Sequence, residues 1–293
     1  MKELSIIVPV YNEENNIEKF IVEVEKNIPP NCEYEILFCM DPSSDNTEKV
    51  LLDCKIKYKN IKIIKLSRRF GQALSIKAGL YNCVSNYIII IDVDLQDPPS
   101  LIPKLYSKIK DGDYECVYAR RRSRAGESNI RKILVSIYYF LVNRFADNNL
   151  NIPTNVGECR IISKKFLDKL KENDRGDFIR GDVPFIGLKQ SKIDFDREER
   201  KFGKSKYLIG SIKGAIIGLL NFSYLFLLIS IFGAIISFVS GIMSLLFGIN
   251  SSYFIFFGIM TIIFIGFVIL LYLKSIFNKI SKNNNFIIDR IID

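Results

Sequence analysis

The chain of 293 residues contains no histidine and no tryptophan. Without histidine, Ser-His-Asp and Cys-His catalytic triads, His-ligated zinc sites and a histidine general base are all excluded. Charged residues make up 25% and hydrophobic residues 48% of the chain, so a disordered protein is excluded as well. Lys and Arg number 41 against 32 Asp and Glu, and the resulting net charge of +9 indicates an anionic partner.

The cysteines form no C-x-x-C pair. They are Cys32, Cys39, Cys54, Cys83, Cys116 and Cys159. This spacing favours reduced structural thiols over a metal or redox site. The chain opens with Met1-Lys-Glu-Leu4 directly before a strand-like run, so we expect no secretory signal peptide and a cytoplasmic first part.

One long stretch carries no charge: no Asp, Glu, Lys or Arg occurs between Lys213 and Lys274. It is about three times the ~20 residues that cross a bilayer as a helix. The sequence predicts two membrane spans, near Tyr224–Phe247 and Phe254–Leu273, joined by a polar turn; a buried hairpin of a soluble protein is the alternative. Basic residues from Arg197 onward precede the stretch and lysines follow it, which predicts that both ends face the cytoplasm.

Short apolar runs alternate with helix-like segments in the first part of the chain. The predicted strands are Leu4–Val10, Tyr34–Met40, Ile61–Leu66, Tyr87–Asp92 and a run near Glu115–Ala119. The predicted helices are Glu14–Asn27, Asn46–Tyr58, Gly71–Cys83 and Pro99–Ile109. Repeated strand–helix–strand units predict a parallel sheet with helices on its faces.

Ligands of such sheets bind beyond the carboxyl ends of the strands. Polar residues follow the first four predicted strands, and we expect them to converge at one edge: Tyr11-Asn12-Glu13, Asp41, Ser67-Arg68-Arg69 and Asp92 to Asp97. The G-x-G-x-x-G fingerprint is missing after the first strand, so a hydride-transferring dinucleotide enzyme is disfavoured.

The acidic run Asp92-Val-Asp94-Leu-Gln-Asp97 is the candidate for ion binding. On an extended strand residues i and i+2 point to the same side, so Asp92 and Asp94 would present two carboxylates together. Such oxygens suit Mg²⁺ or Mn²⁺, whose coordination a diphosphate would complete. Taken alone, the pattern fits a loop of solvated acids before a helix equally well.

Taken together, the motifs resemble those of the family 2 glycosyltransferases, and within them the polyprenyl-phosphate glycosyltransferases such as bactoprenol glucosyltransferase and dolichyl-phosphate mannose synthase. They are Ile7-Val-Pro-Val-Tyr-Asn-Glu-Glu14, Arg69-Phe-Gly-Gln72, Lys77-Ala-Gly79, Asp92-Val-Asp-Leu-Gln-Asp-Pro-Pro99, Asn155-Val-Gly-Glu-Cys-Arg160 and Arg200-Lys-Phe-Gly-Lys-Ser-Lys-Tyr207. The resemblance implies an α/β fold of the glycosyltransferase A type, Rossmann-like with a mainly parallel sheet.

With the uncharged stretch, it also implies four parts of the chain. We expect a cytoplasmic glycosyltransferase domain at residues 1–206, an amphipathic interfacial helix at 207–221, a two-helix transmembrane hairpin at 222–273 and a cytoplasmic tail at 274–293. The helical spacing of apolar residues in 207–221 fits an early start of the first span equally well.

The resemblance further implies roles for individual residues. The nucleotide-sugar site would comprise Pro9, Tyr11, Glu13, Asp41, Arg69, Lys77 and Asp92. Mg²⁺ or Mn²⁺ would be held by Asp92, Asp94 and Gln96. The catalytic residues would be Asp94, Glu158 and Arg200. The lipid phosphate would be bound by Arg120, Arg122, Arg124, Arg131, Arg160, Arg200, Lys204 and Ser205.

Two positions depart from the family pattern. Relatives usually have Asp-Asp-Gly-Ser or Asn-Asp-Gly-Ser after the second strand, whereas Met40-Asp-Pro-Ser-Ser-Asp45 stands here, and Pro42 removes an amide donor. Relatives usually carry Asp where Glu158 stands, and the extra methylene moves the carboxylate by more than about an ångström.

The basic segment Arg120–Lys132 is expected near a lipid phosphate on electrostatic grounds too, because a cationic loop beside a membrane attracts anionic headgroups. Solvated basic faces that only favour membrane proximity are the alternative. Nucleic acid is not expected as a partner, because the positive charge clusters toward the bilayer side of the chain.

The expected activity is inverting transfer of one sugar from a nucleotide sugar, with UDP-glucose favoured, to polyprenyl (undecaprenyl) phosphate at the cytoplasmic membrane. A phosphate acceptor is already anionic, so no strong base is needed, and Glu158 is expected to organise the acceptor site rather than to act as a base. Other donors stay open (GDP-mannose, UDP-galactose, UDP-N-acetylhexosamine, UDP-aminoarabinose derivatives), as does a non-catalytic scaffold that binds nucleotide sugars.

Two further expectations concern related enzymes and assembly. A processive polysaccharide synthase is disfavoured, because such relatives use a Gln-x-x-Arg-Trp motif and this chain has no tryptophan. Packing of neighbouring helix pairs in the membrane favours a homo-oligomer.

Overall fold

The computed structural model describes residues 2–122, 129–146, 152–173, 179–197, 219, 223–247, 251–280 and 286–293. The chain divides into two units. The sheet unit comprises Met1–Lys132, Pro153–Lys206 and Asn284–Asp293. The helical unit comprises Ile133–Ile152 and Tyr207–Asn283. The chain therefore leaves the sheet unit twice and returns to it for its last residues.

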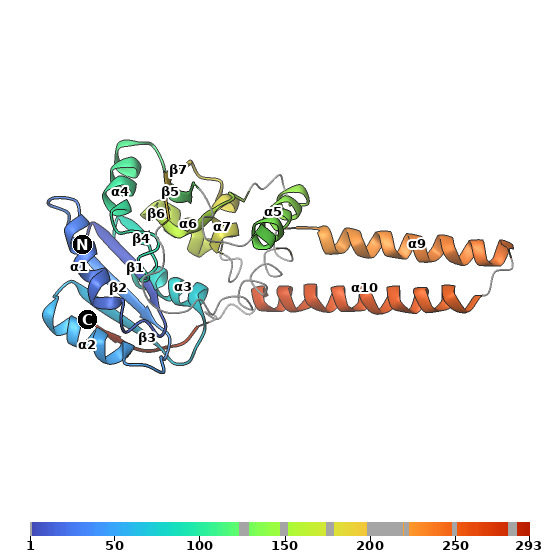
Figure 1. Ribbon diagram of the computed structural model, residues 1–293, viewed down its shortest axis with the longest axis horizontal. Coiled ribbons are helices and arrows are strands. Elements are labelled where there is room, and N and C mark those ends of the chain that lie inside the picture. Colours follow the sequence, from blue (N-terminus) through green and yellow to red (C-terminus); the bar gives the residue numbers. More distant parts are fainter. Residues whose placement is uncertain are drawn as a thin grey trace. The chain divides into compact units, whose positions relative to one another are not determined.

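An eight-stranded sheet with the order β7-β5-β6-β4-β1-β2-β3-β8 forms the centre of the sheet unit (Figure 1). Its strands are β1 (Leu4–Val10), β2 (Tyr34–Met40), β3 (Ile61–Leu66), β4 (Tyr87–Ile90), β5 (Cys116–Arg121), β6 (Val156–Ser163), β7 (Gln190–Phe195) and β8 (Ile288–Ile292). The four strands β3, β2, β1 and β4 are mutually parallel, as are β5 and β7, whereas β6 and β8 run antiparallel to their neighbours. The sheet is thus mainly parallel, as the sequence predicts.

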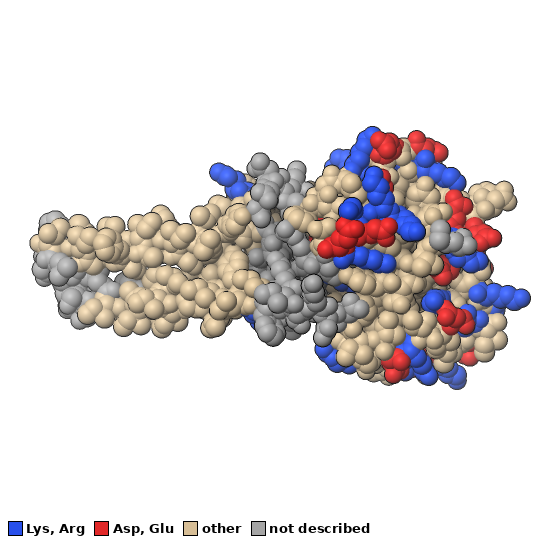
Figure 2. All heavy atoms as spheres, turned by 180° about the vertical axis from the view of Figure 1, so that it is seen from behind, with Lys and Arg blue, Asp and Glu red and all other residues tan. Residues whose placement is uncertain are grey.

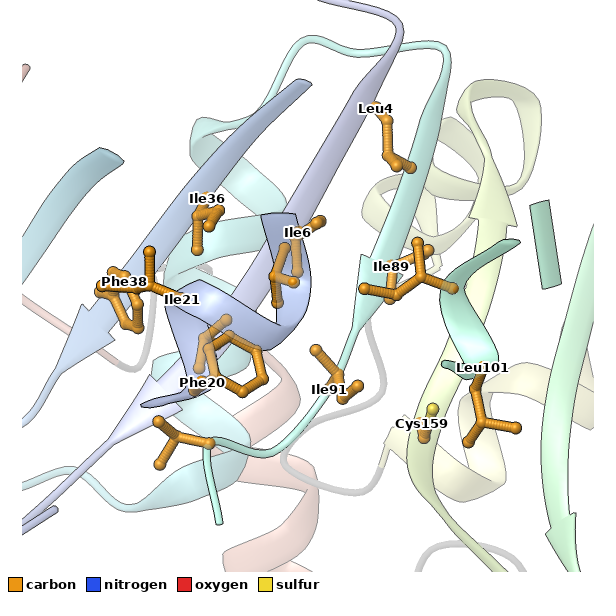
Figure 3. Packing of buried hydrophobic residues seen from close by; sticks show 14 of the residues in the cluster. Leu4, Ile6, Phe20, Ile21, Ile36, Phe38, Ile89, Ile91, Leu101 and Cys159 are labelled. Atoms are coloured by element: carbon orange, nitrogen blue, oxygen red, sulfur yellow. The ribbon is translucent and has the colours of Figure 1, made fainter. Parts of the chain in front are cut away.

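Helices cover both faces of this sheet. They are α1 (Ile17–Asn27), α2 (Thr47–Lys57), α3 (Gln72–Asn82), α4 (Leu101–Asp111), α6 (Lys164–Glu172) and α7 (Ile179–Ile186). Side chains alternate between the faces along a strand, so β1 sends Ile6 into one core with α1, α2 and α4, and Ile7 into a second core with α3 and α6. In the first core, Phe20 of α1 lies against Phe38 of β2 with ring centroids 6.3 Å apart (Figure 3). Burial on both faces explains why these strands read as continuous apolar runs.

The fourth strand differs from its prediction. The bounds of β1, β2 and β3 are confirmed, but β4 ends at Ile90, and a turn begins at Val93, directly after Asp92. Leu95 in this turn has a φ of 61°. The expectation that Asp92 and Asp94 share one side of an extended strand is therefore wrong, because Val93 and Asp94 lie in the turn.

The last residues form a strand where the sequence predicts only a tail at residues 274–293. β8 pairs antiparallel with β3 at the edge of the sheet. Phe286, 6% exposed, packs in the second core and meets Tyr81 edge to face at 6.1 Å. The backbone N–H of Ser67, just after β3, donates to the carbonyl of Ile287 (2.9 Å). The end of the chain is thus part of the sheet unit.

The helical unit contains most of α5 (Asn129–Arg144) together with α9 (Leu225–Phe247) and α10 (Ser251–Ile280), which pack side by side (Figure 1). The stretch Leu225–Met243 of α9 is long and apolar enough to cross a membrane, with a mean hydropathy of 2.5. The apolar stretch of α10, Gly258–Lys274, is shorter. Among the described residues there is thus one helix that is both long and apolar enough to cross a membrane, where the sequence predicts two.

The cysteines are all free thiols, and five of the six are buried. Burial raises the pKa of Cys83 and Cys116 to about 12, so both stay protonated at neutral pH. The expectation of reduced structural thiols is confirmed. The interfacial helix expected at 207–221 lies outside the described residues apart from Leu219.

Candidate active site

The loops that follow β1 and β2 are joined at the carboxyl edge of the sheet. Asn12, with a φ of 55°, donates its backbone N–H to Ser43 Oγ (3.1 Å) and accepts the backbone N–H of Ser44 at its Oδ1 (2.8 Å). The backbone N–H of Glu13 donates to Thr47 Oγ1 (2.9 Å). Asn tolerates the left-handed backbone conformation at this point better than most residues. These bonds hold the two loops together as one wall of the site.

Two of the residues expected at the nucleotide lie against each other. The guanidinium of Arg69 stacks over the ring of Tyr11, with Cζ 4.0 Å from the ring centroid. Pro9 is buried in β1 opposite Cys39 of β2, and Lys77 is buried in α3 with 4% exposure. The stacked pair offers a planar cationic surface at the ends of β1 and β3.

Asp41 organises the turn between β3 and α3. Its carboxylate, on a residue only 2% exposed, accepts the backbone N–H of Phe70 at Oδ1 (3.0 Å) and that of Gly71 at Oδ2 (2.8 Å). Gly71 has a φ of 93°, a conformation that glycine adopts without steric cost. Asp41 was expected at the nucleoside, and the structure places it as the anchor of this turn.

Carboxylates gather around Asp92, just beyond β4. Burial, followed by the negative charges of Asp94, Asp97 and Glu158, raises the pKa of Asp92 to about 7. The side-chain amide of Gln72 donates to Asp92 Oδ1 at 2.7 Å. The structure therefore brings Asp94, Asp97 and Glu158 close enough to Asp92 to repel its negative charge, and this repulsion favours a bound cation.

Two arginines that the sequence analysis did not select lie beside these acids. Asp97, 2% exposed, is 3.3 Å from Arg121 Nη2 and 3.8 Å from Arg197 Nε. A Cβ on Gly157 would lie 2.7 Å from Arg121 Nη2 and 3.1 Å from Asp97 Oδ2, so a larger residue there would require the Arg121 guanidinium to shift. Arg197 also donates to the side-chain oxygen of Gln96 (2.7 Å).

The charges of Arg121 and Arg197 favour binding of an anion beside Asp97 as well. Burial and the adjacent Arg121 guanidinium lower the pKa of Arg197. The buried Nε of Arg121 has no hydrogen-bond partner in the described part of the chain. Two guanidinium groups that share one carboxylate therefore retain capacity for a phosphate.

The residues expected at the lipid phosphate have varied positions. Arg120 forms a two-pronged ion pair with Asp194 of β7 (2.6 and 2.9 Å), and Arg122 pairs with Asp196 (3.0 Å). The backbone of Arg131 lies in α5, and its side chain is not described. The other members of this set lie outside the described residues, except Arg160: Arg124, Arg200, Lys204 and Ser205.

Arg160 is enclosed in the sheet unit with 1% exposure. It donates to Glu158 Oε2 (3.2 Å) and, through the same Nη2, to the carbonyl of Gly157 (2.8 Å). Its Nε donates to the carbonyl of Glu158 (3.0 Å). In this arrangement Arg160 orients the Glu158 carboxylate, which lies near Asp92.

The donor set around Asp92 fits a divalent cation that also binds a phosphate. The carboxylates of Asp92 and Asp94 would supply hard oxygen ligands. The side-chain oxygen of Gln96, expected as a third ligand, accepts a hydrogen bond from Arg197, and its backbone N–H donates to Asp94 Oδ1 (3.1 Å). No group of three or more Cys, Asp and Glu side chains in the described ranges is arranged to hold a metal alone. Phosphate oxygens would therefore complete its coordination.

Comparison with known proteins agrees with this geometry. The family model described as glycosyl transferase family 2 matches residues 5–171. An uncharacterized glycosyltransferase of Synechocystis sp. is 37% identical over 242 residues, which cover 81% of this chain and 75% of the relative. The bactoprenol glucosyl transferase of Shigella phage SfX is 31% identical over 207 residues, or 70% of this chain and 67% of the relative.

Solved structures share the fold at low sequence identity. Glucosyl-3-phosphoglycerate synthase from Mycobacterium tuberculosis, in complex with Mn²⁺, UDP and phosphoglyceric acid, superposes with a TM-score of 0.57 at 16% identity over 75% of this chain and 78% of that one. The mannosyltransferase PcManGT from Pyrobaculum calidifontis, in complex with GDP-Man and Mn²⁺, gives 0.52 at 18% identity over 75% of this chain and 62% of that one. With the family model matching more than half of its length, this chain belongs to glycosyl transferase family 2.

Proposed function

We propose that this protein is a membrane-bound inverting glycosyltransferase that moves one sugar from a nucleotide sugar, with UDP-glucose favoured, to polyprenyl phosphate at the cytoplasmic face of the membrane. The observation that carries the proposal is the juxtaposition of two groups at the carboxyl edge of the sheet. One is the carboxylate group of Asp92, Asp94 and Glu158, and the other is the pair of arginines on Asp97. A cation site beside a phosphate site suits transfer from a nucleoside diphosphate to an anionic acceptor.

The donor side of the site would consist of the stacked Tyr11 and Arg69 and the acids beyond β4. A bound Mg²⁺ or Mn²⁺ supplies charge neutralisation for the departing nucleoside diphosphate. Asp92 and Asp94 would hold it. Structural neighbours solved with Mn²⁺ and UDP or GDP-Man support this choice of ligand class.

The acceptor side would use cations to hold an oxygen that is already negatively charged. Arg121 and Arg197 are anchored by Asp97 and would orient a phosphate without neutralising it fully. Glu158, fixed by Arg160, would organise the acceptor rather than remove a proton, since a phosphate oxygen at neutral pH needs no base. We retain Arg200, Lys204 and Ser205 as further phosphate ligands in this proposal.

A lipid acceptor is supported by relatives named bactoprenol glucosyl transferase and by the helical unit. The helices α9 and α10 show almost only uncharged side chains in Figure 2. We propose that both cross the membrane as a hairpin. Two crossings would return the chain to the side of the membrane from which it started. This agrees with a sheet unit that contains residues from before and after α9 and α10.

The exposed face of α5 supports contact with the membrane surface. Ile133, Leu134, Ile137 and Phe140 are 49% to 65% exposed, at spacings that put them on one side of the helix. The end of α5 is tied to the start of α9, because the backbone N–H of Tyr224 donates to the carbonyl of Phe145 (2.9 Å). An apolar helix face that leads into a spanning helix suits the lipid interface. We also propose that helix pairs of neighbouring copies pack in the membrane as a homo-oligomer.

The test is a transfer assay with the purified full chain, undecaprenyl phosphate, Mg²⁺ or Mn²⁺ and a panel of radiolabelled nucleotide sugars. We expect a lipid-extractable product with one donor, UDP-glucose first, and no product from Asp94→Asn. If the wild type binds a nucleotide sugar but forms no lipid-linked product with any donor, the protein is a nucleotide-sugar-binding scaffold and the proposal fails.

A further inference from the structure

Gln72 connects α3 to the acidic loop beyond β4. It is the first residue of α3, it is half-buried, and its Nε2 donates to Asp92 Oδ1 at 2.7 Å. The hydrogen bond fixes one of the two oxygens of the Asp92 carboxylate. The contact joins the helix that follows β3 to the centre of the candidate active site.

The position of Gln72 is fixed by the turn before it. Asp41 accepts the backbone N–H groups of Phe70 and Gly71, and the backbone N–H of Ser75 donates to the carbonyl of Gly71 (3.0 Å). A buried carboxylate therefore holds the turn from one side, and the first turn of α3 holds it from the other. The side-chain amide of Gln72 is presented by a rigid backbone rather than by a free loop.

The chemistry of the neighbours explains why an amide suits this place. Asp94, Asp97 and Glu158 all act on Asp92 with negative charge, so the carboxylate is repelled from several directions. An amide N–H fixes one carboxylate oxygen and carries no net charge. Lys or Arg in its place would compete with a bound cation for Asp92, and an apolar residue would remove the hydrogen bond that fixes Asp92 Oδ1.

We propose that Gln72 is a positioning residue of the donor site, which holds one oxygen of Asp92 and thereby fixes the orientation in which this carboxylate meets the cation and diphosphate of the donor. This inference rests on the proposed function for the identity of the ligand. It goes beyond that function by assigning a role to Gln72, which would act on the ligand only by orienting Asp92.

The test measures binding of Mn²⁺ in the presence of UDP or GDP to the purified full chain, by electron paramagnetic resonance. Gln72→Met keeps the length of the side chain and removes the amide. We expect Mn²⁺ affinity to fall roughly tenfold, in the range found when a group behind a metal ligand is removed. The melting temperature is expected to stay within about 2 °C of the wild type, since one half-buried hydrogen bond is lost.

A matched control is Gln190→Met in β7. Gln190 is also half-buried, and its Nε2 donates to the carbonyl of Val183 at 2.8 Å. This variant should bind Mn²⁺ like the wild type. Gln72→Ala removes the same amide with no added bulk, so the test also holds if Gln72→Met does not fold.

The outcomes separate this inference from the proposed function. If Gln72 variants that fold bind Mn²⁺ as tightly as the wild type, the positioning role is overturned, whether or not sugar transfer is found. If they bind it roughly tenfold more weakly while the wild type transfers no sugar to any lipid phosphate, the positioning role stands and the acceptor assignment fails.

Discussion

Three consecutive arginines at the end of β5 have different surroundings, because side chains alternate along a strand. Arg120 and Arg122 form ion pairs with Asp194 and Asp196 on one side, and Arg121 reaches Asp97 on the other. The sequence indicated a basic segment but not which residue of it faces the acids. That choice depends on the register of β5 against its neighbours, which no local pattern contains.

Gly157 provides a test of the Arg121–Asp97 pair. In Gly157→Ala the new methyl group would meet the guanidinium at 2.7 Å, and Arg121 would have to move. We expect kcat for sugar transfer to fall roughly tenfold or more, as displacement of a positioning group by about an ångström does. The melting temperature should fall by only a few °C.

The control for this variant is Gly241→Ala in α9, where the added Cβ meets nothing within 4 Å. It should leave kcat unchanged. Full activity in Gly157→Ala would mean that Arg121 does not contribute to the reaction.

The raised pKa of Asp92 predicts a dependence of stability on pH. Its pKa is about 7 in the folded protein and near 3.8 when unfolded, so the folded state resists ionisation and loses stability as the pH rises from about 4 to 7. Asp92→Asn removes this cost while abolishing transfer. In EDTA, the melting temperature of the variant should equal that of the wild type near pH 4 and exceed it by a few °C at pH 7 and above. A difference in melting temperature between the variant and the wild type that does not vary with pH would contradict the raised pKa of Asp92.

At the scale of elements, strands with continuous apolar runs were predictable and the others were not. β1, β2 and β3 are buried on both faces, so composition alone marks them. β6 carries Glu158 and the enclosed Arg160, and β7 is largely polar. Neither strand therefore shows a continuous apolar run or a clear alternation of apolar and polar residues. β8 pairs with β3 across most of the chain length, and such long-range pairing has no local signal.

Phe286 tests whether the last strand stabilises the sheet unit. Phe286→Ala would remove a buried ring from the second core and its contact with Tyr81, a loss of about 3–5 kcal/mol in typical cores. We expect the melting temperature to fall by several °C. Ile287→Ala is the matched control, because Ile287 is 62% exposed and its side chain should contribute little. Equal effects of the two variants would argue against a structural role for the end of the chain.

At the scale of the whole molecule, the α/β class and the mainly parallel sheet followed from the alternation of strands and helices, and the family followed from its motifs. The position of the site at the carboxyl edge was predictable for the same reason. What the sequence could not supply was the environment of each side chain: Asp41 anchors a turn, Arg160 lies inside the sheet unit, and Gln72 meets Asp92. The contacts of Asp41 and Gln72 join segments that are 30 and 20 residues apart in the chain, and Arg160 is enclosed because β6 lies between β5 and β4.

The central claim is that the site transfers a sugar to a lipid phosphate. The most direct measurement is mass spectrometry of lipids extracted after the full chain has been incubated with undecaprenyl phosphate, Mn²⁺ and UDP-glucose or another nucleotide sugar. We expect undecaprenyl phosphate carrying one added sugar from the wild type and none from Asp94→Asn. Unmodified lipid with every donor, in a preparation that binds the nucleotide, would contradict it.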